Sequence, residues 1–116
     1  MKRRIFITED GSASIYAEDL GESYHSHFGA LAESLHVFIE SGLKASSADP
    51  VNILEIGFGT GLNAFLTWNE AVKCKRKTRY YGIEKFPLKE SEWQALGYQN
   101  IGLINSLASY VRVNKY

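Results

Sequence analysis

The chain has 116 residues, with 13 basic and 13 acidic side chains, a formal net charge of +0 and a hydrophobic content of 45%. This length suits one small domain, and the balanced charge gives no sign of a nucleic-acid or membrane partner, although it is compatible with a local basic patch. The one cysteine, Cys74, excludes an internal disulfide, and no apolar run reaches the length of a membrane span. We expect a cytoplasmic protein that does not bind a membrane.

The first 20 residues predict a β-hairpin. Residues 4–8 and 13–17 have strand character, and the turn between them contains the pair Asp10-Gly11, which is typical of tight turns between antiparallel strands. We expect this hairpin to form a small sheet or a lid over the main fold.

Residues 21–49 predict a loop and a helix. The loop at 21–29 contains His25 and His27, but no cysteine or third histidine stands nearby at metal-ligand spacing, so we predict no metal site. A plain polar loop and a substrate or cofactor loop are both compatible with this composition. Apolar residues then recur at helical spacing, which predicts an amphipathic helix over 30–41 with a glycine C-cap and these positions facing the sheet: Leu31, Leu35, Phe38 and Ile39, with Gly42 as the cap.

The stretch from Val51 to Asn63 organises the rest of the chain. An apolar run over 51–56 leads into glycines at every second position, and an amphipathic segment follows. This order predicts a strand, a tight turn and a helix over 62–73. Glycines let the backbone turn sharply and let a ligand approach it, while the amide groups at the start of the helix favour a polar or anionic group.

The glycine spacing narrows the choice of ligand. A dinucleotide fingerprint needs its third glycine where Leu62 stands, so a nucleotide-dependent oxidoreductase is disfavoured, and no Gly-Lys-Ser/Thr triplet of a P-loop is present. The chain has instead an acid followed by alternating glycines: Glu55, Gly57, Gly59 and Gly61. This pattern resembles motif I of the Rossmann-like methyltransferases that use S-adenosylmethionine (SAM), and a plain strand-to-helix turn is the alternative.

A second strand is predicted at 79–84, and it ends in Glu84. This acid lies roughly 20 residues beyond the glycine turn, the spacing of a carboxylate that accepts hydrogen bonds from a ribose. An acid exposed at a strand end is the alternative. The basic run at 73–79 is expected to be a solvated helix end, at the end of the sheet far from the cofactor, and Cys74 is given no catalytic role.

Two further elements are predicted near the C-terminus. Pro87 suits the start of a helix over 88–96, and Gly97 suits its end. The segment 107–113 has weak strand character.

Together these motifs resemble one family, the methyltransferase domain of the bifunctional tRNA-modifying MnmC proteins. The most specific matches are two strings, Glu55-Ile56-Gly57-Phe58-Gly59-Thr60-Gly61-Leu62-Asn63 and Glu84-Lys85-Phe86-Pro87-Leu88. The stretch from Tyr24 to Phe38 is also similar. The resemblance runs from about residue 5 to about residue 96.

The resemblance implies a reaction and a set of residues. The reaction is methyl transfer from SAM to a primary aminomethyl group on the wobble uridine of tRNA. The glycines at 57, 59 and 61 and Glu55 would line the methionine part of SAM, and Glu84 would hold the ribose with Lys85 beside it. The upstream stretch from Tyr24 to Ser26, which includes His25, and Glu33 would lie near the cofactor or the substrate amine.

The family pattern is not matched after residue 96, because two later family segments, of the types Asp-Gly-Phe-Ala-Pro and Asn-Pro-x-x-Trp, are absent. We therefore expect a single truncated α/β domain. It would comprise a β-hairpin at 1–20, a loop and helix at 21–49, and the first βαβ part of a Rossmann-like methyltransferase fold at 50–116. Such a half-sheet has an unpaired edge, so we expect self-association. A catalytically incomplete SAM-binding or structural half-domain, which needs a partner, is the alternative to an active enzyme.

Overall fold

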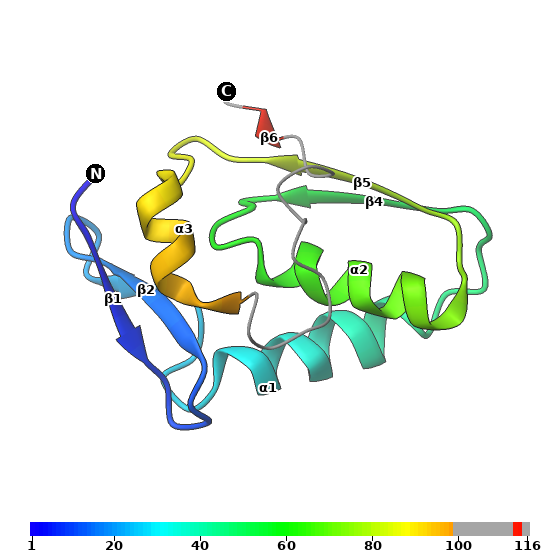
Figure 1. The fold of residues 1–116 in the computed structure, drawn as a ribbon, viewed down its shortest axis with the longest axis horizontal. Helices are drawn as coiled ribbons and strands as arrows, with labels where there is room; N and C mark the ends of the chain where they lie inside the picture. Colours follow the sequence, from blue (N-terminus) through cyan, green and yellow to red (C-terminus); the bar gives the residue numbers. More distant parts are fainter. Residues whose placement is uncertain (99–112, 115–116) are drawn as a thin grey trace.

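The computed structural model describes residues 1–98 and 113–114, and it is a mixed α/β structure with two small sheets (Figure 1). The sheets have the strand orders β1-β2-β3 and β4-β5-β6. The strands are β1 (Arg3–Ile7), β2 (Ala13–Ala17), β3 (Glu22–Ser23), β4 (Val51–Ile56), β5 (Thr78–Ile83) and β6 (Val113–Asn114). The helices are α1 (Ala30–Ser34), which continues as η1 (Leu35–Leu43), α2 (Leu62–Cys74) and α3 (Glu90–Leu96).

The predicted hairpin is confirmed. β1 and β2 pair antiparallel, with Ile5 opposite Ile15, and β3, which the sequence does not predict, pairs with the other edge of β2. Because β2 is the central strand, Ser14 and Ile15 are fully buried although they point to opposite faces. The hairpin is therefore a packed sheet.

The turn between β1 and β2 caps the next helix. Three turn side chains accept hydrogen bonds from the first amides of α1: Thr8 Oγ1 from Ala30 at 3.2 Å, Ser12 Oγ from Leu31 at 3.0 Å, and Asp10 Oδ2 from Ala32 at 2.9 Å. The first amides of a helix have no partner inside the helix, so these contacts hold α1 against the hairpin. Burial raises the pKa of Asp10, but its hydrogen bonds from Ser12, Ala32 and Thr8 outweigh burial and lower the pKa to about 2.

The second part of the long helix is a π-helix, which corrects the prediction for this region. The helix continues to Leu43, so Gly42 lies inside it and is not its C-cap. A π-helix closes hydrogen bonds five residues apart, as between the Lys44 amide and the Ile39 carbonyl (2.9 Å), so its turn is wider than 3.6 residues. The buried positions follow this wider spacing: Ala30, Ser34, Ile39 and Leu43. Consequently Leu35 and Phe38, which were expected to face the sheet, are exposed.

β4, α2 and β5 form a strand–helix–strand unit, as the sequence predicts. β4 and β5 run parallel, and α2 and the α1–η1 helix lie on the same side of them (Figure 1). On that side α2 buries Leu62, Phe65 and Leu66 in the core. On the opposite side of the sheet large apolar side chains are exposed: Leu54 (63%), Ile56 (65%) and Tyr81 (55%).

α3 is tied to the N-terminal sheet. Arg3 of β1 donates twice to the Glu92 carboxylate, from Nε at 3.0 Å and from Nη2 at 2.8 Å. The helix begins at Glu90 rather than at residue 88, and Gly97 ends it in the left-handed conformation (φ 68°), as predicted.

The predicted strand over 107–113 lies outside the described residues except for Val113, which belongs to β6 and pairs with Gly82 of β5. Within residues 1–98 and 113–114, no helix is long and apolar enough to cross a membrane.

Candidate functional site

A cavity of about 760 Å³ opens beside the glycine turn, a volume that suits a small-molecule ligand. Its walls are β4 and the glycine turn, η1, and the loop between β3 and α1. Apolar side chains such as Phe38 and Ile53 line one part of it. Polar residues line the other part: Tyr24, His25, Glu33, Glu55, Asn63 and Glu84.

The glycine turn is built on the end of β5. The amides of Gly57 and Phe58 both donate to the carbonyl oxygen of Ile83, at 2.8 and 3.1 Å. The buried Phe58 ring packs against Gly61 and Gly82. A Cβ at Gly61 would lie 2.9 Å from Phe58 Cε1, and a Cβ at Gly82 would collide with the same ring. Glycine is therefore needed at both positions to seat Phe58.

Two parts of the turn differ in how open they are. Gly57 and Gly59 have left-handed φ angles of 83° and 59°. A Cβ at Gly57 would meet no atom within 4 Å, whereas a Cβ at Gly59 would lie 3.1 Å from Tyr24 Cδ2. Trp93 of α3 holds the turn from another direction, since its indole N–H donates to the Thr60 carbonyl at 3.0 Å. The backbone is thus open to a ligand at Gly57 and covered by Tyr24 at Gly59.

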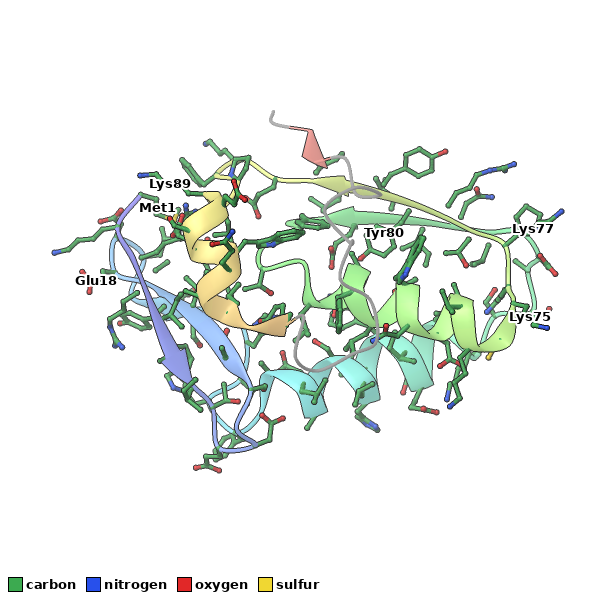
Figure 2. All side chains as sticks on the ribbon, in the orientation of Figure 1. Met1, Glu18, Lys75, Lys77, Tyr80 and Lys89 are labelled. Atoms are coloured by element: carbon green, nitrogen blue, oxygen red, sulfur yellow. The ribbon has the colours of Figure 1, made fainter. Side chains whose placement is uncertain are left out.

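Glu55 and Asn63 meet where β4 ends and α2 begins. Asn63 Nδ2 donates to Glu55 Oε2 at 2.7 Å. Burial is the largest effect on the Glu55 carboxyl group and raises its pKa, and the nearby charge of Glu84 raises it further. Hydrogen bonds from Asn63 and Tyr80 lower the pKa but do not outweigh burial, so the pKa lies above its usual range. Tyr80 lies on the side of the sheet that faces α2 (Figure 2).

Two buried acceptor oxygens at this point have no hydrogen bond of regular geometry to the described residues, Glu55 Oε1 and Asn63 Oδ1. The Tyr80 hydroxyl interacts with the Glu55 carboxylate and lowers its pKa, so Asn63 Oδ1 is the acceptor that is left without a donor. Buried acceptors are normally paired, so the junction of β4 and α2 favours a ligand that donates an N–H group.

Glu84 lines the cavity and is half-buried, which does not suit an acid simply exposed at a strand end. Its Oε1 accepts the Gly59 amide at 2.7 Å, and its Oε2 accepts the Phe86 amide at 3.0 Å. Each carboxylate oxygen has a second lone pair, so Glu84 fixes the turn and retains one further acceptor site on each oxygen.

The structure brings seven of the predicted site residues to the cavity: Tyr24, His25, Glu33, Glu55, Gly57, Gly59 and Glu84. Gly61 lies in the turn, packed against Phe58, and does not line the cavity. Ser26 also lies outside it, and its Oγ accepts the Phe28 amide at 3.1 Å. Lys85 lies outside it with Nζ 5.5 Å from the centre of the Phe86 ring.

Among the polar cavity residues that sequence reasoning misses are Asn63 and Tyr80. Asn63 lies in the same sequence motif as the glycines, and this position could have identified it as a cavity residue. Tyr80 pairs with Ile53 across the two parallel strands, so strand alternation places it on the helix-facing side once the register is known. His25 belongs to the stretch from Tyr24 to Ser26 that the family resemblance places near the cofactor or the substrate amine, and it lines the cavity.

The two loop histidines have different partners. His25 Nδ1 lies 2.7 Å from Ser14 Oγ, whereas the His27 ring packs on the Phe6 ring with the ring centres 4.8 Å apart. The described part of the chain contains no group of three or more potential ligands that would hold a metal ion.

The basic run at 73–79 lies at the opposite end of the sheet from the glycine turn, as Lys75 and Lys77 show in Figure 2. Its lysines are exposed, as expected of a solvated helix end. Arg76 corrects that expectation, because it is half-buried and clamps the loop before β4. Its guanidinium donates to three carbonyl oxygens, those of Leu43 at 2.9 Å, Ser46 at 2.8 Å and Ala48 at 2.7 Å and 3.0 Å.

Comparison with known proteins gives matches to MnmC proteins. The chain is 40% identical over 77 residues to the tRNA 5-methylaminomethyl-2-thiouridine biosynthesis bifunctional protein MnmC of Leptospira borgpetersenii serovar Hardjo-bovis (strain JB197), a match that covers 60% of this chain and 12% of that protein. It is 33% identical over 119 residues to MnmC of Burkholderia mallei (strain NCTC 10229), with 92% of this chain and 18% of that protein covered. No family model matches the chain.

The fold gives the same relationship. The structure resembles the crystal structure of MNMC2 from Aquifex aeolicus with a TM-score of 0.70 and 26% sequence identity, and the match covers 99% of this chain and 42% of that chain. The chain thus spans between 12% and 18% of the two curated proteins. Sequence and fold together identify the chain as a homologue of one segment of the MnmC proteins.

Proposed function

We propose that the chain is a SAM-dependent methyltransferase of the MnmC type, or part of one, and that it methylates an aminomethyl group on a tRNA uridine. The observation that carries the proposal is the pair of buried acceptors without a regular hydrogen bond, Glu55 Oε1 and Asn63 Oδ1, beside the open backbone of Gly57. A ligand that suits them carries a cationic N–H group at the end of a slender chain. The methionine part of SAM has such a group, its α-ammonium.

The other cavity residues suit the remainder of SAM. Glu84 has one free acceptor site on each carboxylate oxygen, which matches two adjacent ribose hydroxyls. Three carboxylates line the cavity, those of Glu33, Glu55 and Glu84, and together they favour a cationic ligand. Tyr24 covers the turn at Gly59 and would border the cofactor there. Gly61 would act by seating Phe58, and Ser26 and Lys85 stay predictions as flanking residues.

The proposed chemistry asks for positioning more than for a reactive side chain. When bound, SAM supplies a methyl group on a positively charged sulfur. The chain has to hold a neutral amine in line with the bond that breaks. We interpret β4, α2 and β5 as the first part of a Rossmann-like cofactor fold, because a ligand in such folds lies at the carboxyl ends of parallel strands.

The proposed acceptor follows from the relatives. Their name assigns them to tRNA 5-methylaminomethyl-2-thiouridine biosynthesis. Methylation of a 5-aminomethyl group yields the methylaminomethyl group of that product, so the proposed partner is tRNA that carries 5-aminomethyl-2-thiouridine.

A second candidate is a SAM-binding or structural half-domain that needs a partner. It is favoured by β4, which pairs only with β5 among the described strands, and by the exposed Leu54 and Ile56 on the same strand. An open strand edge with apolar neighbours promotes association. Light scattering after size exclusion tests this candidate: an assembly supports it, and a stable monomer speaks against self-association.

The first test is calorimetric titration with S-adenosylhomocysteine (SAH). Micromolar binding by the wild-type chain, lost in Glu84→Ala and retained in Glu9→Ala, supports the proposed site. Glu9 is a matched control because it is exposed and does not line the cavity. If the folded wild-type chain binds no SAH, the proposal is rejected and the partner-dependent candidate is favoured.

A further inference from the structure

His25 has a built position in the cavity that the proposed cofactor contacts do not use. Its Nδ1 lies 2.7 Å from the hydroxyl oxygen of Ser14. Ser14 is fully buried in the central strand β2, so one side of the ring is fixed by the core of the N-terminal sheet. The ring itself borders the cavity. A histidine fixed at one nitrogen presents the other nitrogen in a defined direction.

The nitrogen left for a ligand is Nε2. Nε2 makes no hydrogen bond within the described residues, and it is not among their fully buried unpaired atoms. It is therefore accessible from the cavity. Burial lowers the pKa of His25 and Glu33 raises it, and the pKa lies below its usual value, so the ring is neutral near pH 7. A neutral ring whose Nδ1–H is donated to Ser14 Oγ has a free lone pair on Nε2.

The proposed methyl acceptor, a primary amine, requires a group with such a lone pair to take up a proton. A primary aminomethyl group is mostly an ammonium ion near pH 7, because aliphatic amines have pKa values near 10. An ammonium nitrogen has no lone pair and cannot attack a methyl group. It must lose one proton before transfer, and a group positioned beside it promotes that loss.

We propose that His25 Nε2 accepts this proton, with Ser14 Oγ holding Nδ1–H on the far side of the ring. This role rests on the proposed function. The N–H bond of the ammonium breaks and its electron pair stays on nitrogen as the proton passes to Nε2. That lone pair then forms the new N–C bond while the S–C bond breaks and its electron pair stays on sulfur. The imidazolium gives its proton to water when the methylated ammonium leaves, so one proton is released in each turnover.

The charged surroundings of His25 are compatible with this role. β2 presents the uncharged hydroxyl of Ser14 to the ring, and α1 presents Glu33, which favours the protonated ring by attraction. From β4 and the end of β5, Glu55 and Glu84 line the same cavity and add negative charge. These carboxylates would attract the incoming ammonium ion and stabilise the imidazolium that forms.

The kinetic test compares His25→Gln with His36→Gln. His36 is exposed and does not line the cavity, so its variant is a matched control for the same change of side chain. We expect both variants to bind SAH within about threefold of wild type. We expect His25→Gln alone to lower kcat/KM for tRNA carrying 5-aminomethyl-2-thiouridine by about 100-fold at pH 7. That deficit should shrink towards about pH 9.5, as more of the amine is neutral without help.

The second test does not depend on activity. Nitrogen chemical shifts of the His25 ring in the free chain report its tautomer, and we expect the proton on Nδ1. Ser14→Ala should shift the ring towards the Nε2–H tautomer. A proton on Nε2 in the wild-type chain overturns the role, whether or not the chain transfers methyl groups.

The outcomes separate the two proposals. Wild-type transfer with an equally active His25→Gln variant, or a deficit that is constant with pH, overturns the role of His25 and leaves the proposed function intact. Absence of SAH binding by the folded wild-type chain overturns the proposed function, and the role of His25 with it.

Discussion

Two turns of this molecule lie at the starts of helices, and they differ in how the polar groups in or beside them are paired. In the turn over 8–12, the side chains of Thr8, Asp10 and Ser12 all meet backbone amides of α1. Beside the turn over 57–61, two buried acceptors, Glu55 Oε1 and Asn63 Oδ1, have no regular hydrogen bond within the described residues. Hydrogen bonds within the chain stabilise the fold, whereas a buried acceptor without a hydrogen bond favours the binding of a ligand that donates one. Changes in the first turn should therefore alter stability, and changes beside the second should alter binding.

The largest effect is expected at Gly61. In Gly61→Ala the residue keeps a left-handed φ of 80°, and its Cβ lies 2.9 Å from the buried Phe58 ring. Left-handed strain and overpacking together should lower the free energy of unfolding by about 2–4 kcal/mol. Urea denaturation followed by circular dichroism measures this change.

The control for that variant is Gly57→Ala. Its φ of 83° is also left-handed, but its Cβ meets no atom within 4 Å. It should cost only about 1–2 kcal/mol, while the new methyl group in the cavity weakens SAH binding. Equal destabilisation by the two variants would show that the packing of Phe58 is not what separates them.

Asp10→Ala should destabilise the fold without affecting the cavity. It removes the acceptor of the Ala32 amide and the hydrogen bonds from Thr8 and Ser12. Loss of such a helix cap costs about 1–2 kcal/mol. SAH affinity, measured at a temperature where both chains are folded, should stay within about twofold of wild type. A larger loss of affinity would mean that the two turns are coupled.

Glu55→Gln is expected to show the reverse behaviour. The amide keeps the shape of the side chain but removes its charge, so a charge-assisted contact to the ammonium group is lost and SAH affinity falls about tenfold, or about 1.4 kcal/mol. The free energy of unfolding should not fall, because burial already raises the pKa of Glu55 and disfavours its charged form. A variant that loses stability and keeps SAH affinity would contradict the proposed role.

The two turns also differ in their response to acid. The folded pKa of Asp10 is about 2, below its usual value of 3.8. A lowered folded pKa gives stability that is present above about pH 4 and is lost as the pH falls towards 2. Because Asp10 is partly solvated, the loss is expected to be about 1 kcal/mol. Urea denaturation between pH 5 and pH 2.5 should show a steeper decline for wild type than for Asp10→Ala, and parallel declines would refute the assignment.

The elements that follow from local pattern are the ones the sequence predicts. The strand, turn and helix from Val51 to Cys74 rest on alternation, glycine spacing and an amphipathic face, and their bounds agree closely with β4 and α2. The long helix is predicted as a helix, and Leu31 and Ile39 face the core as expected. A period of 3.6 also places Leu35 and Phe38 inward, whereas the wider π-helical turn leaves them exposed and buries Leu43.

The contacts that were not predicted join residues that are distant in sequence. Ser14 holds His25 across two strands, and Arg76 clamps the carbonyl of Leu43. The seat for Phe58 depends on Gly82, a glycine that the fingerprint does not include. Seven of the candidate cavity residues follow from motif spacing and family resemblance. Neither approach can show which side chains already have partners, because those partners are set by tertiary packing.

A third turn, at the end of α2, can be compared with the first two, and we expect it to contact no ligand. Lys75 is the one non-glycine residue in the described part of the chain with a positive φ (54°), and it lies far from the glycine turn (Figure 2). Lys75→Gly should relieve that strain and raise the free energy of unfolding by about 0.5–1 kcal/mol, because glycine adopts this C-cap conformation freely. Lys77→Gly in the same exposed loop has no strain to relieve and should lower it slightly. SAH affinity should be unchanged in both, so a shift in affinity in Lys75→Gly would mean that the two ends of the sheet communicate.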